Sequence, residues 1–346
     1  MDFQLYLQES ASEVERELES LYDLWRKDAK KVSPVLLPLI DITIEACKGG
    51  KRVRGALVKL GFELANDSGQ SQKDIIKVGA AFEIFQTAIL AHDDIIDKSP
   101  LRRGKPTIYK ALGGDHYAIS QTICLGDVGF FHAMEIISKT NFPEKNKNLA
   151  LQSFSRTMLE TALGEILDVE IPHLKTQRQE KDVITISHLK TARYTITGPL
   201  LLGAILAGSE KKLLTALKEF GDNLGVAFQI QDDILGVFGT EGEIGKSVTS
   251  DIEEGKNTLL ITESLKKATP KQKATLEELY GRESLTPEQI NQVKEIFEAT
   301  GALDYSRALA LEYVGEAKKL IPEVSNNQAH QNLLNQMADY LIERKK

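Results

Sequence analysis

The spacing of apolar residues constrains this chain most, because it keeps the three- and four-residue step of an α-helix along almost the whole sequence. In residues 10–28, Val14, Leu18, Leu21 and Trp25 recur at that step and so share one helix face. We find no series of alternating apolar and polar residues and no β-hairpin signal. The pattern therefore predicts an all-α fold.

The other segments with this pattern follow one another without a clear boundary or an internal repeat, so we expect a single domain over residues 1–346. One segment has a clear helix start, in which Thr286 is the N-cap, Pro287 the first helical residue and Gln289 the third. Gly61 lies inside another segment and weakens its helical pattern. The expected helices span residues 34–47, 52–66, 72–96, 115–139, 147–169, 183–207, 210–237, 257–268, 270–280, 287–299, 301–319 and 325–344.

The overall charge of the protein is acidic, with a formal net charge of -7 and an isoelectric point of about 5.6. This argues against a nucleic acid or an anionic membrane surface as a partner. The two cysteines, Cys47 and Cys124, cannot form a disulfide framework and fit the reducing cytoplasm. The chain starts with an acidic, amphipathic segment rather than a signal peptide. Its longest apolar stretch, residues 198–208, is too short to span a bilayer.

Three aspartates stand at the end of a strongly apolar segment. Asp93, Asp94 and Asp97 follow the run from Ala81 to Ala91, and positions four apart on a helix lie about 40° apart, so Asp93 and Asp97 share a face. The alternative is a solvated helix end, but the apolar run indicates burial, so we expect the carboxylates to open onto a pocket. Carboxylate oxygens suit Mg²⁺, which usually bridges carboxylates to substrate phosphates.

A second pair of aspartates, Asp232 and Asp233, lies in another apolar helical segment and follows Gln229. Two acidic helices are a known way to build a metal site in a helical bundle. We therefore expect the two acidic clusters to serve one site.

Basic residues gather in short motifs of this acidic protein. In GGKRVRG, residues 49–55, two glycines free the backbone before Lys51 and Arg54, and backbone N–H groups at a helix start can meet an anion. Taken alone, each basic residue is best interpreted as an ordinary solvated side chain. Together, and opposite two acidic motifs, they indicate phosphate oxygens, which arginine binds bidentately and lysine as a point charge. The residues concerned are Lys51, Arg54, Arg102, Arg103, Lys105, Lys190, Lys246 and Lys256.

The chemistry that needs both sets of residues involves two diphosphate groups, one bound through carboxylate-held Mg²⁺ and one bound directly by Lys and Arg. No nucleophile and base stand out as a pair, and His92 beside the first cluster is more often a hydrogen-bonded neighbour than a base. The sequence has no P-loop, GxGxxG or GxSxG motif, which argues against nucleotide transfer and acyl chemistry.

In chain order the motifs are GGKRVR, DDIID followed by LRRGKPT, Lys190-Thr191, QIQDD and a Gly-Lys loop. Over nearly the whole chain this series resembles that of the trans-isoprenyl diphosphate synthases, or polyprenyl synthetases. The resemblance implies a bundle of roughly ten or more helices around a central cavity, a homodimer, and a cytoplasmic, Mg²⁺-dependent prenyltransferase. Such an enzyme condenses isopentenyl diphosphate with an allylic diphosphate to give an all-trans polyprenyl diphosphate.

The resemblance also implies a role for each matching residue. Three Mg²⁺ ions would be held by Asp93, Asp97 and Asp232, with Asp94 and Asp233 in support. A carbocation would form as the allylic diphosphate leaves, and it would be stabilised by Thr191, Gln229 and the Lys190 carbonyl. Isopentenyl diphosphate would bind to Lys51, Arg54, Gln86 and Arg103. The allylic diphosphate would bind to Arg102, Lys190, Thr191, Gln229, Lys246 and Lys256. On this interpretation the acidic and basic clusters both face anions and do not neutralise each other.

Some positions depart from the commonest family pattern. Gln86 stands where many bacterial members have histidine, and Gly55 replaces a frequent proline. Gly236 stands where a third aspartate is usual, which leaves Asp232 with the main role in the second motif.

Product length depends on the residues before the first aspartates, because the growing tail is expected to run along that helix face. Ala88 and Ile89 are not the bulky aromatics that the resemblance links to a farnesyl-length product. A deeper floor could come from Phe85, Phe82, Phe130 or Phe131. We therefore expect a product of C20 or longer, with farnesyl diphosphate synthesis as the alternative.

Three other functions stay open at this point. A terpene cyclase also uses an aspartate-rich helix and Mg²⁺, but it binds one diphosphate and leaves Lys51, Arg54 and Arg103 without a role. A partner subunit of a heteromeric prenyltransferase typically loses the aspartate motifs, whereas this chain keeps both. An acidic helical scaffold would lose only stability on substitution of Asp93 or Arg103.

Overall fold

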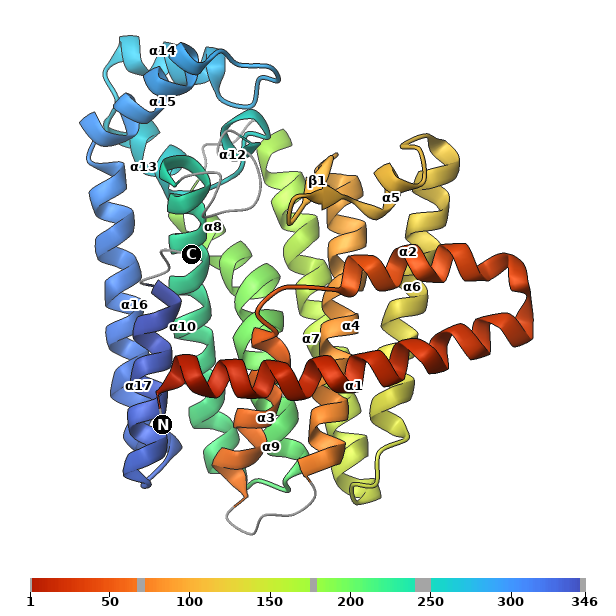
Figure 1. Cartoon of the computed structure of the whole chain (residues 1–346). Coiled ribbons are helices and arrows are strands. Elements are labelled where there is room, and N and C mark those ends of the chain that lie inside the picture. The colour runs from red at the N-terminus through yellow and green to blue at the C-terminus, as the bar shows by residue number, and fades with distance from the viewer. Residues whose placement is uncertain (1, 67–71, 175–178, 240–249, 343–346) are drawn as a thin grey trace. The chain divides into compact units, whose positions relative to one another are not determined.

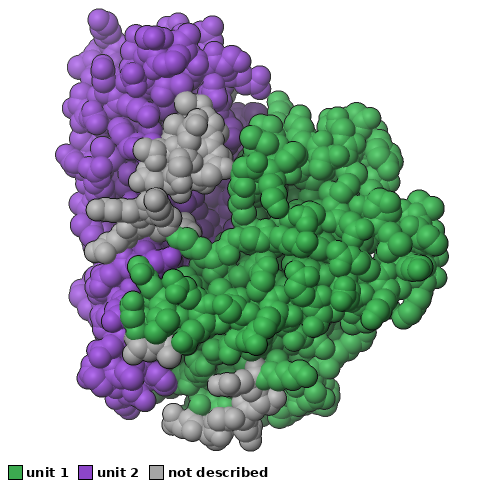
Figure 2. Space-filling model, in the orientation of Figure 1, with its two compact units in different colours: residues 1–155, 198–214 green, residues 156–197, 215–346 purple. Residues whose placement is uncertain are grey.

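The structure is a computed structural model that describes residues 2–66, 72–174, 179–239 and 250–342. Almost all elements in it are helices, so the all-α prediction is confirmed. Figure 1 follows the chain from its N-terminus to its C-terminus. The chain divides into two compact units, drawn in different colours in Figure 2. Unit 1 comprises Met1–Ser155 and Gly198–Leu214, and unit 2 comprises Arg156–Thr197 and Thr215–Lys346.

Unit 1 carries the first aspartate cluster. Helix α1 turns back into α2 and also packs across α3 and α4, while α4 packs on α6 (Figure 1). The elements of unit 1 are α1 (Phe3–Val32), the 3-10 helix η1 (Pro34–Leu36), α2 (Leu37–Cys47), α3 (Val53–Ala65), α4 (Gln72–Ile96), β1 (Leu101–Arg102), β2 (Lys105–Pro106), α5 (Ile108–Ala111), α6 (His116–Ser138), the first part of α7 (Glu144–Glu170) and α9 (Gly198–Leu206).

Glycines let the helices of unit 1 approach closely. A Cβ atom on Gly61 of α3 would collide with the backbone of Leu200 in α9, and one on Gly203 of α9 would collide with the backbone of Val58. The glycine that weakened the predicted pattern is therefore where two helix backbones meet. The GGKRVRG motif spans the loop before α3 and the first residues of this helix.

Four phenylalanines form an aromatic core behind the first aspartate cluster. Phe85 of α4 packs on Phe154 of α7 with ring centroids 4.7 Å apart, and on Phe130 of α6 at 5.7 Å. Phe82 meets Phe154 edge to face at 5.6 Å, a preferred geometry for aromatic pairs. This packing fixes α4, which ends in the aspartates.

Unit 2 carries the second aspartate pair. Its core is apolar and brings α10, α13, α15 and α16 together around Val226, Leu260, Val293 and Phe297. The elements of unit 2 are the second part of α7, the 3-10 helix η2 (Ile171–His173), α8 (Glu180–Ile186), the π-helix η3 (Ser187–Thr197), α10 (Lys211–Phe238), α12 (Ser250–Glu253), α13 (Leu259–Lys267), α14 (Pro270–Leu279), α15 (Pro287–Ala299), α16 (Ala302–Val324) and α17 (Gln328–Ile342).

The predicted start of α15 is confirmed in detail. Thr286 accepts a hydrogen bond from the backbone N–H of Gln289, whose side chain accepts from the N–H of Thr286. The same reciprocal pair joins Thr269 and Gln272 at the start of α14. Such capping boxes satisfy backbone donors that a helix start leaves open.

Two predictions of secondary structure were wrong. The predicted helix over residues 183–207 is three elements, α8, η3 and α9, because the chain adopts π-helical geometry from Ser187 to Thr197. The predicted absence of a β-hairpin fails at β1 and β2, which pair antiparallel.

One described helix, over Lys73–Ile96, is long and apolar enough to cross a membrane by length and composition. However, 72% of its most apolar window is buried inside the protein, as in the core helix of a globular protein.

Candidate active site

The C-terminal end of α4 sets the geometry of the first aspartate cluster. Lys98 has a left-handed backbone with φ 52°, its N–H donates to the Ile95 carbonyl, and the Ser99 N–H donates to the Asp94 carbonyl. These two bonds make a Schellman motif, which usually has glycine at the left-handed position. The motif turns the chain sharply after Asp97 and sends the next residues back toward the carboxylates.

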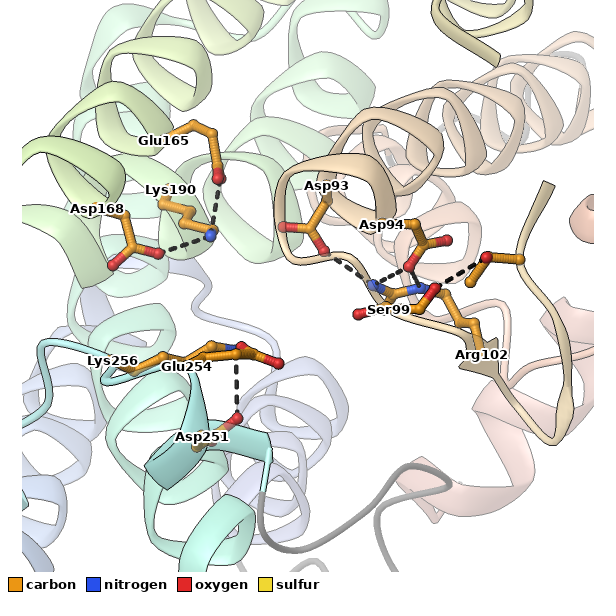
Figure 3. Close-up of polar contacts among 11 residues, drawn as sticks. Asp93, Asp94, Ser99, Arg102, Glu165, Asp168, Lys190, Asp251, Glu254 and Lys256 are labelled. Atoms are coloured by element: carbon orange, nitrogen blue, oxygen red, sulfur yellow. Dashed lines mark hydrogen bonds and ion pairs between the residues drawn. The ribbon is translucent and has the colours of Figure 1, made fainter. Parts of the chain in front are cut away.

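The returning segment is the β1–β2 hairpin, and it brings Arg102 onto two of the aspartates. Arg102 Nε donates to Asp94 Oδ1 at 2.7 Å, and its Nη2 donates to Asp93 Oδ2 at 2.8 Å (Figure 3). Thr107 Oγ1 donates to the Ser99 carbonyl and so ties the far end of the hairpin to the end of α4. The expectation that the acidic and basic clusters do not neutralise each other is wrong for Arg102, because its guanidinium bridges two carboxylates.

The environments of the three aspartates differ. Asp94 is buried, whereas Asp93 and Asp97 are partly exposed. Burial raises the pKa of Asp94 to about 6, against the opposing effect of Arg102. A buried carboxylate with a raised pKa gains from any nearby cation, and here Arg102 supplies it.

The tip of the hairpin presents a second arginine in another direction. Arg103 and Gly104 both have positive φ angles, 54° and 73°, as a two-residue type I′ turn requires. Arg103 Nη1 donates to the Gly49 carbonyl at 3.1 Å. A Cβ atom on Gly50 would come within 3.0 Å of the Arg103 guanidinium carbon, so the guanidinium lies flat against this glycine.

The GGKRVRG loop therefore meets the hairpin at Arg103, as the predicted role of both in one anion site requires. Arg52 in that loop has a different function: it is buried, its Nε donates to Glu15 at 2.5 Å, and its Nη1 lies 3.6 Å from Glu83. Desolvation by the neighbouring chain lowers the pKa of Arg103, with Glu83 opposing and Arg52 contributing. An anion placed beside Arg103 would offset that cost.

Glu83 is a residue that the sequence reasoning missed. It is buried on α4, one helical turn before Gln86, which is also buried, and its Oε1 accepts the backbone N–H of Gly55 at 2.9 Å. Proline, the frequent residue at position 55 in the family, has no N–H to donate. Glu83 thus fixes both the start of α3 and Arg52, and the signal for it was an acidic residue inside an apolar run.

In unit 2, Lys190 and Thr191 lie in the π-helix η3. Lys190 Nζ lies 2.8 Å from Glu165 and donates to Asp168 at 2.7 Å (Figure 3). Lys190 is thus paired with two acids of α7, which the sequence reasoning missed. A Cβ atom on Gly164 would collide with the backbone of Lys190, so α7 and η3 touch at this point.

Thr191 belongs to a short chain of hydrogen bonds that reaches the second aspartate pair. Thr191 Oγ1 donates to Gln229 Oε1 at 2.5 Å, and Gln229 Nε2 donates to Asp233 Oδ1 at 2.6 Å. Burial and the neighbouring Asp251 raise the pKa of Asp233 well above its usual range. Asp232 is exposed. The structure thus brings together Thr191, Gln229 and Asp233, three of the predicted residues.

Gly236 faces a carboxylate from another element. A Cβ atom on Gly236 would collide with Oδ2 of Asp251 in α12, and Asp251 is buried. Lys256 Nζ lies 3.2 Å from Asp251 and 3.1 Å from Glu254 (Figure 3). An aspartate at position 236 would clash with Asp251, so the departure from the family pattern has a local cause. Lys246 lies outside the described residues.

The residues proposed for product length lie on α4 and α6. Ala88 is buried. A Cβ atom added to Gly129 of α6 would lie 2.8 Å from the Cβ atom of Ala88. Ile89 is partly exposed, and Phe85 lies in the aromatic core. The suggestion that Phe131 forms part of a floor is wrong within the described chain, because 71% of its surface is exposed.

The donor chemistry at both acidic clusters fits a hard divalent cation. The expected ligands are carboxylates, with no thiol or imidazole among them. Two of these carboxylates, Asp93 and Asp94, already form ion pairs with the cationic guanidinium of Arg102. Within the part of the chain that the structure describes, no group of three His, Cys, Asp or Glu side chains is arranged to hold a metal. Binding of a metal at Asp93 and Asp94 would therefore require Arg102 to move.

The all-helical fold, with two acidic helices and a cationic loop, defines an enzyme of the isoprenoid synthase type. A model of the polyprenyl synthetase family matches residues 38–299. A short chain isoprenyl diphosphate synthase of Methanothermobacter thermautotrophicus is 34% identical over 298 residues, which cover 86% of this chain and 87% of the relative. A geranylgeranyl pyrophosphate synthase of Geoglobus acetivorans is 32% identical over 302 residues, with 86% and 87% covered.

A solved structure agrees over the full length. The geranylgeranyl pyrophosphate synthase from Corynebacterium glutamicum, complexed with isoprenyl diphosphate and magnesium, matches with a TM-score of 0.90 and 26% identity, covering 100% of both chains. The present chain belongs to the polyprenyl synthetase family and is a trans-prenyltransferase.

Proposed function

We propose that this enzyme condenses isopentenyl diphosphate with an allylic diphosphate, head to tail, to give an all-trans polyprenyl diphosphate of C20 or longer. The observation that carries the proposal is that two consecutive arginines bind different partners. Arg102 binds the carboxylates of Asp93 and Asp94, whereas Arg103 turns to the Gly49–Gly50 loop. A single hairpin thus serves one site that suits a metal-bound diphosphate and another that suits a diphosphate bound by cations.

The allylic diphosphate is assigned to the carboxylates. Asp93, Asp97 and Asp232 are the proposed ligands of Mg²⁺, in three ions per active site, with Asp94 and Asp233 in support. Bound Mg²⁺ would neutralise the charge that develops on the leaving diphosphate. The diphosphate, carrying its metal, would take the place of the guanidinium on the carboxylates and leave Arg102 to bind its oxygens directly. Lys190, Lys246 and Lys256 are the further cations assigned to this group.

Isopentenyl diphosphate is assigned to Lys51, Arg54, Gln86 and Arg103. Arg54 is partly buried, whereas Arg103 and Lys51 are exposed and so accessible to a ligand. Bidentate guanidinium groups match diphosphate oxygens without a metal. Gln86 is one turn from Glu83, and its amide can donate to a phosphate oxygen.

The reaction breaks the C–O bond of the allylic diphosphate and forms a C–C bond to the double bond of isopentenyl diphosphate. The electron pair of the broken bond leaves with the diphosphate, and the proton lost from the new chain passes to that same diphosphate. Thr191 Oγ1, the Gln229 side chain and the Lys190 carbonyl are proposed to face the allylic cation. The hydrogen bond from Thr191 to Gln229 supports this assignment because it orients the Thr191 lone pairs.

A product of C20 or longer is supported by the small residue at position 88 and by relatives that are geranylgeranyl diphosphate synthases. We propose that Ala88, Ile89 and Phe85 set the length at which growth stops. An aromatic side chain at position 88 would collide with α6, because Ala88 lies against Gly129 of that helix.

We also propose that the enzyme is a cytoplasmic homodimer with residues 1–346 as one domain. The dimer is supported by an exposed stripe on α6 formed by Tyr117, Val128 and Phe131, with exposed fractions of 56%, 43% and 71%, since apolar surface of this kind marks interfaces. A single domain is supported by the chain path, because each unit consists of two separate stretches.

The test is a Mg²⁺-dependent assay in which labelled isopentenyl diphosphate is offered with dimethylallyl, geranyl or farnesyl diphosphate and the products are sized. The proposal predicts incorporation of label into products of C20 or longer and none in chelator. Products that stop at C15 would establish the farnesyl alternative. A cyclic product without label would identify a cyclase, and activity only with a second protein would identify a subunit.

A further inference from the structure

The segment that carries Lys190 and Thr191 is held in an uncommon helical form. Ser187–Thr197 is a π-helix of 11 residues, whereas π-helices mostly occur as single-turn bulges with i→i+5 hydrogen bonds. A backbone of this kind persists only when its surroundings specify it. The question is which side chains do so.

One carboxylate of α10 binds three residues of η3. His188 Nε2 lies 3.1 Å from Asp222 Oδ2, Arg193 Nη1 lies 3.3 Å from Asp222 Oδ1, and Thr197 Oγ1 donates to Asp222 Oδ1 at 2.8 Å. Glu160 of α7 holds Arg193 from the other side at 2.9 Å. Asp222 exposes only 16% of its side chain, so little of its charge reaches water.

This triple contact depends on the helix type. In an α-helix of 3.6 residues per turn, Arg193 would lie about 140° and Thr197 about 180° around the axis from His188. In a π-helix of about 4.4 residues per turn they lie about 50° and about 15° from His188. The three side chains therefore share a face, and can reach one carboxylate together, only in the π form.

Two glycines beside Asp222 let η3 approach α10. A Cβ atom on Gly221 would lie 2.8 Å from Thr197 Oγ1 and 2.9 Å from its Cα, and one on Gly225 would collide with Ala192. Gln229, which accepts the Thr191 hydroxyl, is two turns beyond Asp222 and about 20° from it around α10. One face of α10 thus contacts η3 from Thr191 to Thr197.

We propose that Asp222 is a positioning residue that selects the π-helical form of η3 and so sets the place of Lys190 and Thr191. The functional part of this inference rests on the proposed roles of those two residues in the allylic half of the reaction. Asp222 itself bonds to neither of them. It acts through the backbone of η3, whose register fixes where the Thr191 hydroxyl and the Lys190 carbonyl lie.

The first test is structural and does not depend on activity. Amide hydrogen exchange is measured by mass spectrometry on the full-length protein and on Asp222→Asn, without substrate. Exchange over residues 188–197 should become about tenfold faster or more, as expected for the loss of hydrogen bonds to one group, with α17 unchanged. Unchanged exchange over residues 188–197 would overturn the proposal, whatever the enzyme does.

The second test separates positioning from general damage. Asp222→Asn should lower kcat about tenfold or more, because a misplaced group costs the chemical step, and should leave the KM for isopentenyl diphosphate unchanged. In a double-mutant cycle its effect should shrink in a Thr191→Val background and stay full in an Arg103→Ala background. Full additivity with Thr191→Val would contradict an action through that residue.

Matched variants complete the design. Lys218 bonds to the same carboxylate at 3.0 Å but belongs to α10, so Lys218→Met should leave hydrogen exchange and kcat as they are. If Asp222→Asn does not fold, Thr197→Val can be used instead, because it removes one hydrogen bond to Asp222 with little change in side-chain shape. It should speed exchange near Thr197 and lower kcat by a smaller factor, and wild-type values for both would overturn the proposal.

Discussion

Thr191 Oγ1 donates a hydrogen bond to Gln229 Oε1 at 2.5 Å, and this contact joins the π-helix η3 to α10. It leaves the hydroxyl lone pairs turned away from Gln229, where they can face a positive charge. Thr191→Val keeps the shape of the side chain but removes this oxygen. We expect kcat to fall about tenfold or more, with the melting temperature little changed. Thr185→Val, at a partly exposed position on α8, is the control, and an equal loss of kcat there would contradict the assignment.

The two glycines of the cationic loop offer a matched pair. Both have positive φ, 80° at Gly49 and 90° at Gly50, so alanine at either position costs about 1–2 kcal/mol of backbone strain. Arg103 bonds to the Gly49 carbonyl, but only a Cβ on Gly50 would press on its guanidinium, since a Cβ on Gly49 would meet nothing within 4 Å. Gly50→Ala should therefore raise the KM for isopentenyl diphosphate well above that of Gly49→Ala in steady-state kinetics. Equal KM values would argue that Arg103 is not part of that site.

Removal of Arg102 should expose the repulsion among the aspartates. In Arg102→Gln, Asp93 and Asp94 lose their guanidinium, and we expect a loss of about 1–2 kcal/mol of stability in chelator, because the pair is only partly buried. Mg²⁺ should restore more stability to this variant than to the wild type in thermal unfolding. Lys105→Gln, on the same hairpin but 62% exposed, is the control. An identical Mg²⁺ response in all three proteins would count against a metal at these carboxylates.

Restoring the usual aspartate at position 236 should harm this enzyme. In Gly236→Asp the new side chain collides with Asp251 and displaces its contact with Lys256, at a cost of about 1–3 kcal/mol. We expect lower kcat/KM and a lower melting temperature. The double variant Gly236→Asp with Asp251→Ala should recover stability, because it moves the carboxylate from α12 to α10. No recovery in the double variant would mean that the clash is not the cause.

An aromatic residue at position 88 should shorten the product. Ala88→Phe should shift the products toward C15, and it should also cost about 1–3 kcal/mol, because Ala88 lies against Gly129 of α6. Ile89→Phe, at a partly exposed position, should cost less stability. Products are sized by chromatography. An unchanged length in both variants would show that residues 88 and 89 do not set the product length.

Much of the fold could be predicted from periodicity and capping alone. The boundaries of α4, α10 and α15 follow the apolar pattern and the Thr286 capping box closely. The π-helix could not be predicted, because it is specified by tertiary contacts of Asp222, Glu160 and Gln229 and not by local preference. The hairpin was missed for a related reason, since Arg103 adopts the left-handed conformation that sequence rules reserve for Asn or Gly.

The residue types of the candidate site were visible in the sequence, but their partners were not. Asp93, Arg102, Thr191 and Gln229 were recognised from motifs, yet nothing local indicates that Arg102 would bind the aspartates of its own motif. Glu165 and Asp168 are ordinary acids of a helix until η3 brings Lys190 to them. Nothing local to Asp251 indicates that its carboxylate lies against Gly236 of α10.

We propose that one diphosphate is held through metal by carboxylates and the other by cations alone. Equilibrium binding tests it most directly, with isopentenyl diphosphate and an unreactive thiolo analogue of an allylic diphosphate titrated separately, in Mg²⁺ and in chelator. We expect the allylic analogue to bind only with Mg²⁺. Isopentenyl diphosphate should bind in both conditions, and Arg103→Ala should weaken its binding. Tight binding of the allylic analogue in chelator, or binding of isopentenyl diphosphate that Arg103→Ala leaves unchanged, would contradict it.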